Sequence, residues 1–262
     1  MLKLEKVFKT FNPGTVNAKT ALNGLDLTLN KGDFVTVIGG NGAGKSTMLN
    51  AVAGVFSVDE GHIFIDGQDV TKLPEYKRAA YLGRVFQDPM MGTAPSMQIE
   101  ENLALAARRG KRRGLRWGIT AAERASYVDL LADLELGLED RLTAKVGLLS
   151  GGQRQALTLI MASLQKPKLL LLDEHTAALD PKTAAKVLEL SRRIVEKDNL
   201  TTLMITHNMK DALTYGNRLI MMDAGRVVLD VSGEEKQKLT VPQLIELFGK
   251  ASSEATDKML LS

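Results

Sequence analysis

A glycine-rich run at residues 39–47 holds the groups best suited to chemistry in this chain. The run is Gly-Gly-Asn-Gly-Ala-Gly-Lys-Ser-Thr, and it matches the phosphate-binding pattern G-x-x-x-x-G-K-[ST]. Glycines let backbone N–H groups approach a phosphate without a Cβ atom in the way. Lys45 brings a mobile positive charge to the β- and γ-phosphates, and the Ser46 hydroxyl suits Mg²⁺. The run therefore predicts that the chain binds a nucleoside triphosphate.

Such a loop needs a strand before it and a helix after it, and the flanking residues predict both. Residues 33–38 form a short apolar, β-branched run that is typical of a strand. Apolar residues at 48–53 recur at three- and four-residue spacing, which predicts a helix that ends at Gly54. The positive end of this helix would point at the bound anion. A chance match in a glycine-rich turn is the alternative, and this flanking pattern argues against it.

Two further segments place polar groups where ligands commonly bind. The run 149–153, Leu-Ser-Gly-Gly-Gln, precedes a strongly patterned helix. A serine and two glycines at a helix start are suited to an anion, although an ordinary helix cap looks the same. The apolar run 169–172 predicts a buried strand that ends in Asp173 and Glu174, where ligands bind in open α/β sheets. The alternative for these two carboxylates is a strand-end cap pair.

Three single residues complete the candidate set, and each has a structural alternative. Phe11 precedes a Pro-Gly loop and either stacks on a base or packs in the core. Gln87 follows a strand predicted over 81–86 and is otherwise an ordinary polar loop residue. His207 follows a strand predicted over 203–206 and is otherwise a hydrogen-bonded turn histidine.

Composition limits the class of protein. The 262 residues are 44% hydrophobic and 25% charged, which is ordinary for one α/β domain with a subdomain. The net charge of +3 is too small to indicate nucleic-acid binding by itself, and the absence of cysteine excludes disulfides and thiolate metal sites. No apolar run reaches the roughly 18–20 residues of a membrane span, and the first residues lack an apolar signal core. We expect a cytosolic protein that reaches a membrane only through a partner.

The remaining elements follow from periodicity, caps and turn residues. Strands dominate 1–38, whereas helices dominate 88–165 and include one over 99–109 and one opened by the capping box of Thr120. Between these two helices, residues 108–117 hold six basic residues and no acid. A solvated loop, a contact with an anionic membrane face and nucleic-acid binding all remain open for this basic run. Later elements are a hairpin at 62–67, helices opened by Asp180-Pro181 and by Asn208, a hairpin over 218–231 and a helix over 240–248.

Taken together, these motifs resemble the ATP-binding cassette (ABC) ATPases. The order and spacing match over about residues 2–248, through the phosphate loop, Gln87, 149–153, 169–174, 178–180 and His207. The resemblance implies an α/β fold: a P-loop NTPase core with a mixed or parallel sheet, an N-terminal antiparallel β subdomain and an inserted α-helical subdomain. It implies a single cassette over 1–248, with a catalytic lobe at 1–87 and 166–248, a helical subdomain at 88–165 and a flexible tail at 249–262.

The resemblance also implies a role for each candidate residue. Glu174 would be the general base, assisted by His207, Gln87 and Lys45. The residues implied to bind ATP are Phe11, Gly39, Asn41, Gly42, Ala43, Gly44, Lys45, Ser46, Thr47, Ser150, Gly151, Gly152, Gln153 and Asp180. The residues implied to hold Mg²⁺ are Ser46, Gln87 and Asp173. In this family Ser150–Gly152 bind the ATP held by a second subunit, which implies a head-to-tail pair around two ATP molecules.

Local similarity to a bacterial importer-type subgroup implies the biological role. The chain would hydrolyse ATP to power an ABC membrane transporter that imports a small solute such as an amino acid. Its partners would be a second copy of itself, integral-membrane permease subunits and a substrate-binding lipoprotein, with no nucleic acid, and it would lie on the inner face of the cell membrane. The alternatives are a cassette ATPase acting on DNA or the ribosome, and a binding-only cassette with a dead site. Single-copy motifs, the absence of cysteine and long coiled coils, and an intact Lys45 and Glu174 argue against them.

One residue departs from the family pattern. His175 stands directly after Glu174, where proline is common in the family. A histidine removes the fixed φ of proline and adds a titratable ring beside the implied base. We expect His175 to be structural and to tune this loop.

Overall fold

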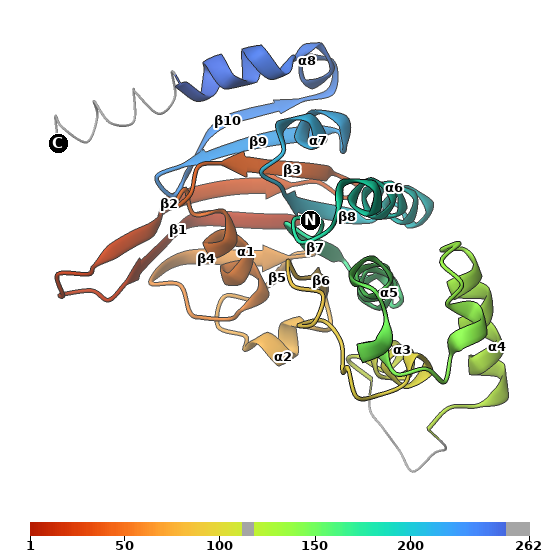
Figure 1. The fold of residues 1–262 in the computed structure, drawn as a ribbon. Helices are drawn as coiled ribbons and strands as arrows, with labels where there is room; N and C mark the ends of the chain where they lie inside the picture. The colour runs from red at the N-terminus through yellow and green to blue at the C-terminus, as the bar shows by residue number, and fades with distance from the viewer. Residues whose placement is uncertain (112–117, 250–262) are drawn as a thin grey trace, which may run out of the picture. The chain divides into compact units, whose positions relative to one another are not determined.

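The computed structural model describes residues 1–111 and 118–249 (Figure 1). The chain divides into two compact units: Met1–Arg78 together with the chain from Asn199 onward, and Ala79–Asp198. The predicted ends of the helical subdomain, at residues 88 and 165, both fall inside the second unit. Residues 112–117 of the basic run and most of the predicted tail lie outside the described residues. Within the described residues, no helix is long and apolar enough to cross a membrane.

The first unit contains an antiparallel sheet with the strand order β2-β1-β4-β5. Its strands are β1 (Leu2–Phe11), β2 (Lys19–Leu29), β4 (Glu60–Ile65) and β5 (Gln68–Asp69). Along β2 the buried Leu25, Leu27 and Leu29 alternate with exposed polar residues, as the sequence predicts. The β4–β5 turn uses Asp66 and Gly67 with φ values of 53° and 80°, the left-handed geometry that favours a tight hairpin. The predicted N-terminal antiparallel sheet is therefore confirmed.

The same unit also contains a mixed group of strands, in the order β10-β9-β3-β8. Its elements are β3 (Phe34–Gly39), α1 (Lys45–Ala53), α2 (Glu75–Arg78), β8 (Thr201–Ile205), α7 (Met209–Thr214), β9 (Arg218–Asp223), β10 (Arg226–Ser232), α8 (Gly233–Lys238) and a helix at 241–249. Strand β3 is parallel to both β8 and β9, and β10 is antiparallel to β9. All three parallel strands therefore end at one edge, where ligands bind in α/β folds.

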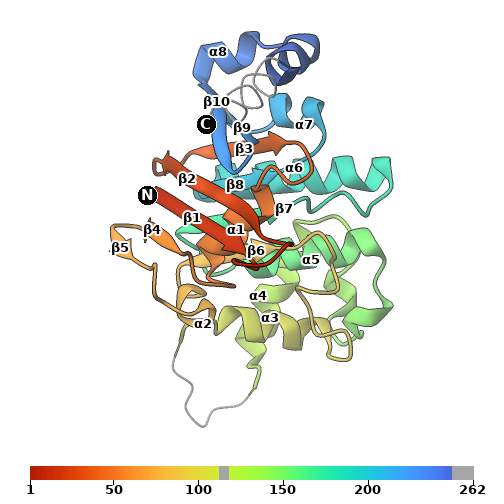
Figure 2. The ribbon, with the colours of Figure 1, turned by 90° about the vertical axis from the view of Figure 1, so that its left-hand side faces the viewer.

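The second unit is mainly helical and also contains two parallel strands. Its elements are β6 (Leu82–Val85), α3 (Ile99–Ala107), α4 (Ala121–Ala132), α5 (Gly151–Ser163), β7 (Leu169–Asp173) and α6 (Pro181–Asp198). Helix α3 packs against both α4 and α5. In Figure 2, α3 is yellow and α4 and α5 are green. Helix α4 begins with the predicted capping box, in which the Thr120 side chain accepts from Glu123 N and Glu123 accepts from Thr120 N. Helix α3 ends at Ala107, two residues before its predicted end.

Two residues of the basic run take part in this unit's packing. The Arg108 guanidinium donates to a Glu123 carboxylate oxygen at 2.8 Å and to the Ala104 carbonyl at 2.9 Å. Arg109 donates to the Ala162 carbonyl at 3.1 Å, and burial lowers the pKa of its guanidinium. These two cations therefore hold helices of the unit together.

Candidate active site

The phosphate-binding loop lies between β3 and α1 in the first unit. Gly44 precedes α1 with φ 98°, and a Cβ atom there would lie 2.5 Å from the Ala21 carbonyl oxygen, so only glycine fits. No side chain caps the N-terminus of α1, which leaves its first N–H groups for an anion. The buried Lys45 ammonium donates to the carbonyl oxygens of Gly39 at 2.8 Å and Gly40 at 3.1 Å. The loop therefore combines free amides, a helix N-terminus and a cation, which suits a polyphosphate.

Arg78 anchors the helix that carries this loop, although its sequence context does not single it out. Only 2% of the residue is exposed. Its guanidinium donates to the carbonyl oxygens of Ala51 (2.7 Å), Val52 (3.0 Å), Thr71 (2.9 Å) and Leu73 (2.8 Å). The first two carbonyls belong to the last turn of α1, where a positive charge is favourable for the helix dipole. Burial lowers the pKa of Arg78, but a guanidinium stays protonated at neutral pH.

Phe11 ends β1 at the sheet margin and is 36% exposed, so it is not a core side chain. Its ring meets Phe56 edge to face, with the centroids 5.3 Å apart, and the Lys9 ammonium lies 5.7 Å from its centroid. Edge-to-face packing fixes the orientation of the Phe11 ring without covering all of it. The arrangement leaves an aromatic surface that a purine base can stack on.

We expect Phe11→Ala to weaken ATP binding by about fivefold to a hundredfold, since base–aromatic stacking contributes roughly 1–3 kcal/mol. Calorimetric titration of ATP into the wild-type and variant chains measures this change. Phe11→Tyr, which keeps the ring, is the matched control and should bind ATP as the wild type does. Unchanged affinity in Phe11→Ala would show that the exposed ring has no part in nucleotide binding.

His207 lies at the same strand edge as the phosphate loop, within the first unit. Thr206 N donates to the Val37 carbonyl at 3.1 Å, which aligns the end of β8 with the end of β3. His207 is the next residue and is exposed. Asn208 then caps α7 by accepting from the backbone N–H groups of Lys210 and Asp211. Parallel pairing thus brings together two motifs that are far apart in sequence.

The second unit gathers the other polar candidates at the ends of its two parallel strands. Asp173 is the last residue of β7, and Gln87 lies two residues after β6. Because β6 and β7 pair in parallel, the two strands end at the same edge. Asp173 forms an ion pair with Arg84 of β6 at 3.4 Å, and both side chains are about 15% exposed. The Arg84 guanidinium also lies over the Phe86 ring, 4.5 Å from its centroid. Sequence reasoning missed Arg84, because only the pairing of β6 with β7 places it beside the carboxylate.

Glu174 and His175 form a tight turn directly after β7. Glu174 has φ 43°, a left-handed conformation that is uncommon for a residue with a side chain, and its carbonyl accepts from Ala177 N at 2.9 Å. His175 is only 2% exposed, and its Nε2 lies 2.9 Å from the Ser191 hydroxyl of α6. Burial lowers the pKa of His175 to about 4, so the ring is neutral at neutral pH.

The run 149–153 begins α5, and its polar groups form a capping box. The Ser150 hydroxyl accepts from Gln153 N at 3.3 Å, while Gln153 Oε1 accepts from Ser150 N at 3.1 Å. The Gln153 amide also donates to the Leu136 carbonyl at 3.2 Å. Ser150 and Gly151 are exposed at the helix N-terminus, whereas Gln153 is engaged in holding the cap.

Gly152 and Asp180 connect this helix start to α6. A Cβ atom on Gly152 would lie 2.1 Å from Thr183 Cγ2, so any larger residue there would force the Thr183 side chain to move. Asp180 Oδ1 accepts from Thr183 N at 3.1 Å and caps α6. Hydrogen bonds from the Thr183 side chain and backbone lower the pKa of this exposed carboxyl. The predicted cap and the Pro181 start of α6 are both present.

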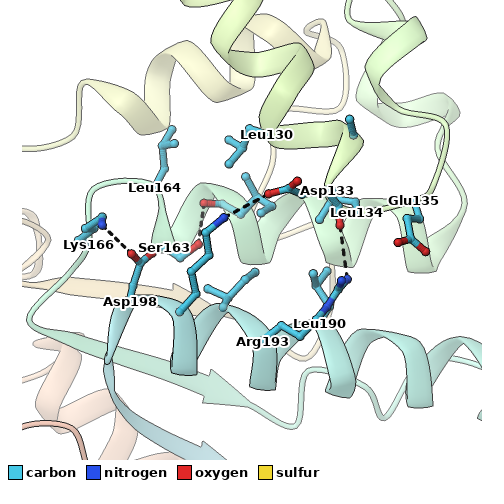
Figure 3. Close-up of a pocket in the computed structure, with 14 residues that line it drawn as sticks. Leu130, Asp133, Leu134, Glu135, Ser163, Leu164, Lys166, Leu190, Arg193 and Asp198 are labelled. Carbon is cyan, nitrogen blue, oxygen red and sulfur yellow. Dashed lines mark hydrogen bonds and ion pairs between the residues drawn. The ribbon is translucent and has the colours of Figure 1, made fainter.

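Two cavities border the helices of the second unit, and no residue of the phosphate loop lines either one. The first, of about 600 Å³, lies among α4, α5 and α6 (Figure 3). Several of its charged groups have partners: Lys197 pairs with Asp133 at 3.2 Å, Lys166 pairs with Asp198 at 2.6 Å, and Arg193 donates to the Asp133 carbonyl at 3.4 Å. The second, of about 800 Å³, is partly lined by Ser150, Gly152, Gln153 and Thr183.

Comparison with known proteins agrees with this arrangement. The family model described as ABC transporter matches residues 22–177. The chain is 48% identical to the tyrosine transport ATP-binding protein of Clostridioides difficile, over 95% of this chain and 98% of that protein. It is 35% identical to the spermidine/putrescine import ATP-binding protein PotA of Haemophilus ducreyi over 90% of this chain, but spans only 59% of that relative's length.

Solved structures extend the comparison to the fold. The dimeric post-hydrolysis state of the ATP-binding cassette MJ0796, bound to ADP and Pi, is 32% identical with a TM-score of 0.75, and the match covers 88% of this chain and 98% of that one. The ADP conformation of the cassette MJ1267 is 28% identical with a TM-score of 0.76, over 95% of this chain and 98% of that one. The fold class predicted from the sequence motifs is confirmed. The chain therefore belongs to the ABC transporter family, within which it is an ATPase cassette that binds and hydrolyses ATP.

Proposed function

We propose that the chain powers the import of small amino-acid-like solutes, with aromatic amino acids such as tyrosine as the first class to test. The observation that carries this proposal is the 48% identity, over almost the full length of both chains, to a tyrosine transport ATP-binding protein. Other relatives are named for the import of polyamines and methionine, which also supports import of small solutes over action on DNA or the ribosome.

The proposed catalytic site uses the residues predicted from sequence. Lys45 and the loop amides hold the phosphates, Phe11 stacks on the adenine, Glu174 polarises the attacking water, and Gln87 and His207 orient the water and the γ-phosphate. This division of work suits phosphoryl transfer, in which positioning and charge stabilisation dominate.

Mg²⁺ would be held by Ser46, Gln87 and Asp173, whose hydroxyl, amide and carboxylate oxygens are the donors this hard cation prefers. No cluster of three or more His, Cys, Asp or Glu side chains suited to a metal occurs in the described part of the chain. Mg²⁺ in nucleotide sites commonly keeps several waters and binds substrate phosphates together with one or two protein groups. When bound, the ion would neutralise part of the negative charge on the phosphates.

The proposed assembly is a head-to-tail dimer on a permease. Ser150 and Gly151 present an exposed helix N-terminus that suits the γ-phosphate held by a second copy, with Gly152, Gln153 and Asp180 supporting it. The proposed catalytic lobe comprises residues 1–87 and 166–248, and the proposed helical subdomain comprises residues 88–165. Further proposed partners are permease subunits and a substrate-binding lipoprotein, which would keep the chain on the inner membrane face.

Reconstitution of the chain with its permease and binding protein in proteoliposomes tests this function. We expect ATP-dependent uptake of labelled tyrosine, competition by phenylalanine or tryptophan, and no uptake when Lys45 is replaced by alanine. Polyamine uptake without amino-acid uptake would overturn the substrate class. Co-purification with ribosomes or DNA and no permease would overturn the transport role.

A further inference from the structure

The turn that carries Glu174 is held in an unfavourable backbone conformation. A left-handed conformation is unfavourable for a residue with a Cβ atom, and it persists only where the surroundings enforce it. At Glu174, with φ 43°, two contacts that restrict the backbone are the hydrogen bond from Ala177 N to the Glu174 carbonyl and the burial of the next side chain, His175. The buried His175 ring contacts Ser191 of helix α6, another element of the same unit.

The direction of the hydrogen bonds shows how His175 is held. The Ser191 hydroxyl donates its single proton to the Val187 carbonyl, one helical turn earlier, at 2.8 Å. It can therefore only accept from the imidazole, which makes His175 Nε2–H the donor across the 2.9 Å contact. Ser191 is itself 1% exposed, so water does not compete for either group.

We propose that His175 is a positioning residue for the catalytic base, and that its hydrogen bond to Ser191 ties the Glu174 turn to helix α6. This rests on the proposed role of Glu174 as the base. This hydrogen bond restricts the backbone directly after Glu174. It therefore fixes the direction in which the Glu174 carboxylate points from the end of β7. Without it, the turn relaxes toward more favourable φ values, and fewer molecules hold the carboxylate where it can polarise water.

The tie predicts a specific kinetic pattern in the full-length chain. His175→Ala and Ser191→Ala should each lower kcat about tenfold, the scale of one lost buried hydrogen bond. The KM for ATP should stay within about twofold, because neither His175 nor Ser191 is among the residues proposed to hold the phosphates. His175→Gln, whose amide Nε2 also donates at that reach, should recover most of kcat. The double variant should be no slower than the slower single variant.

Ser163→Ala is the matched control. Ser163 is also buried in a helix, and its hydroxyl donates to the carbonyls of Leu159 and Ile160 within α5. It has no hydrogen bond to the Glu174 turn, so its loss should leave kcat unchanged. Thermal unfolding of all variants separates misfolding from mispositioning, and Ser191→Ala tests the tie even where His175→Ala fails to fold.

Wild-type kcat in folded His175→Ala and Ser191→Ala would overturn the proposal. An equal loss of kcat in Ser163→Ala would also overturn it, since the effect would then be general packing. Failure of the base assignment is a separate result: Glu174→Gln would then keep its turnover. If Glu174→Gln is inactive while His175→Ala and Ser191→Ala are fully active, the base assignment stands and only the positioning role of His175 is refuted.

Discussion

Replacing Glu174 with glutamine should leave a chain that folds and binds ATP but hydrolyses it at least about a hundredfold more slowly, since a positioned general base contributes 10²–10⁴-fold. The amide has nearly the shape of the carboxylate and no basic oxygen, so binding survives and water activation does not. ATP should then hold two chains together, because hydrolysis no longer releases them. Phosphate release and size-exclusion chromatography with ATP and Mg²⁺ measure the two effects.

Glu189→Gln is the control for this charge change. Glu189 is an exposed carboxylate on α6 of the same unit, paired with Arg192 on the surface. Its replacement should change neither turnover nor association. A Glu174→Gln chain that stays monomeric with ATP and hydrolyses at the wild-type rate would contradict both the base assignment and the ATP-sandwich dimer.

Removing the Arg78 side chain should lower the free energy of unfolding by about 3–5 kcal/mol, because two buried and two partly buried carbonyl oxygens lose a charged donor. Two of these carbonyls end α1, so the variant should also bind ATP more weakly through a loosened phosphate loop. Arg78→Lys keeps the charge but lacks the planar guanidinium group, whose N–H groups donate in several fixed directions. It should therefore recover only part of the stability. Urea unfolding and ATP titration measure these changes.

Arg192 provides the contrasting control for Arg78. Its guanidinium also makes several bonds, to Glu189 and Glu196, but all three side chains are exposed on α6. Surface ion pairs of this kind contribute little, so Arg192→Ala should unfold almost as the wild type does. Equal stability of Arg78→Ala and wild type would show that the buried contacts of Arg78 do not anchor α1.

Local chemistry made much of this protein predictable. The phosphate loop, the caps at Thr120, Asp180 and Asn208, and the Asp66-Gly67 hairpin each depend on groups within about eight residues of one another. Such interactions leave fixed spacings in the sequence, because helix caps and tight turns allow few residue types at each position. The order of these motifs along the chain was enough to indicate the family and its fold.

Tertiary structure decided which distant side chains support those motifs. Arg84 reaches Asp173 only because β6 and β7 pair in parallel, and Arg78 reaches α1 across about 26 residues of chain. The tie from His175 to Ser191 likewise depends on the packing of α6 against the turn. Contacts of this kind leave no periodic trace, because the intervening chain sets no constraint on residue type. The sequence by itself determined the chemistry that the chain can perform, and only the tertiary structure decided how its helices, strands and turns are held to perform it.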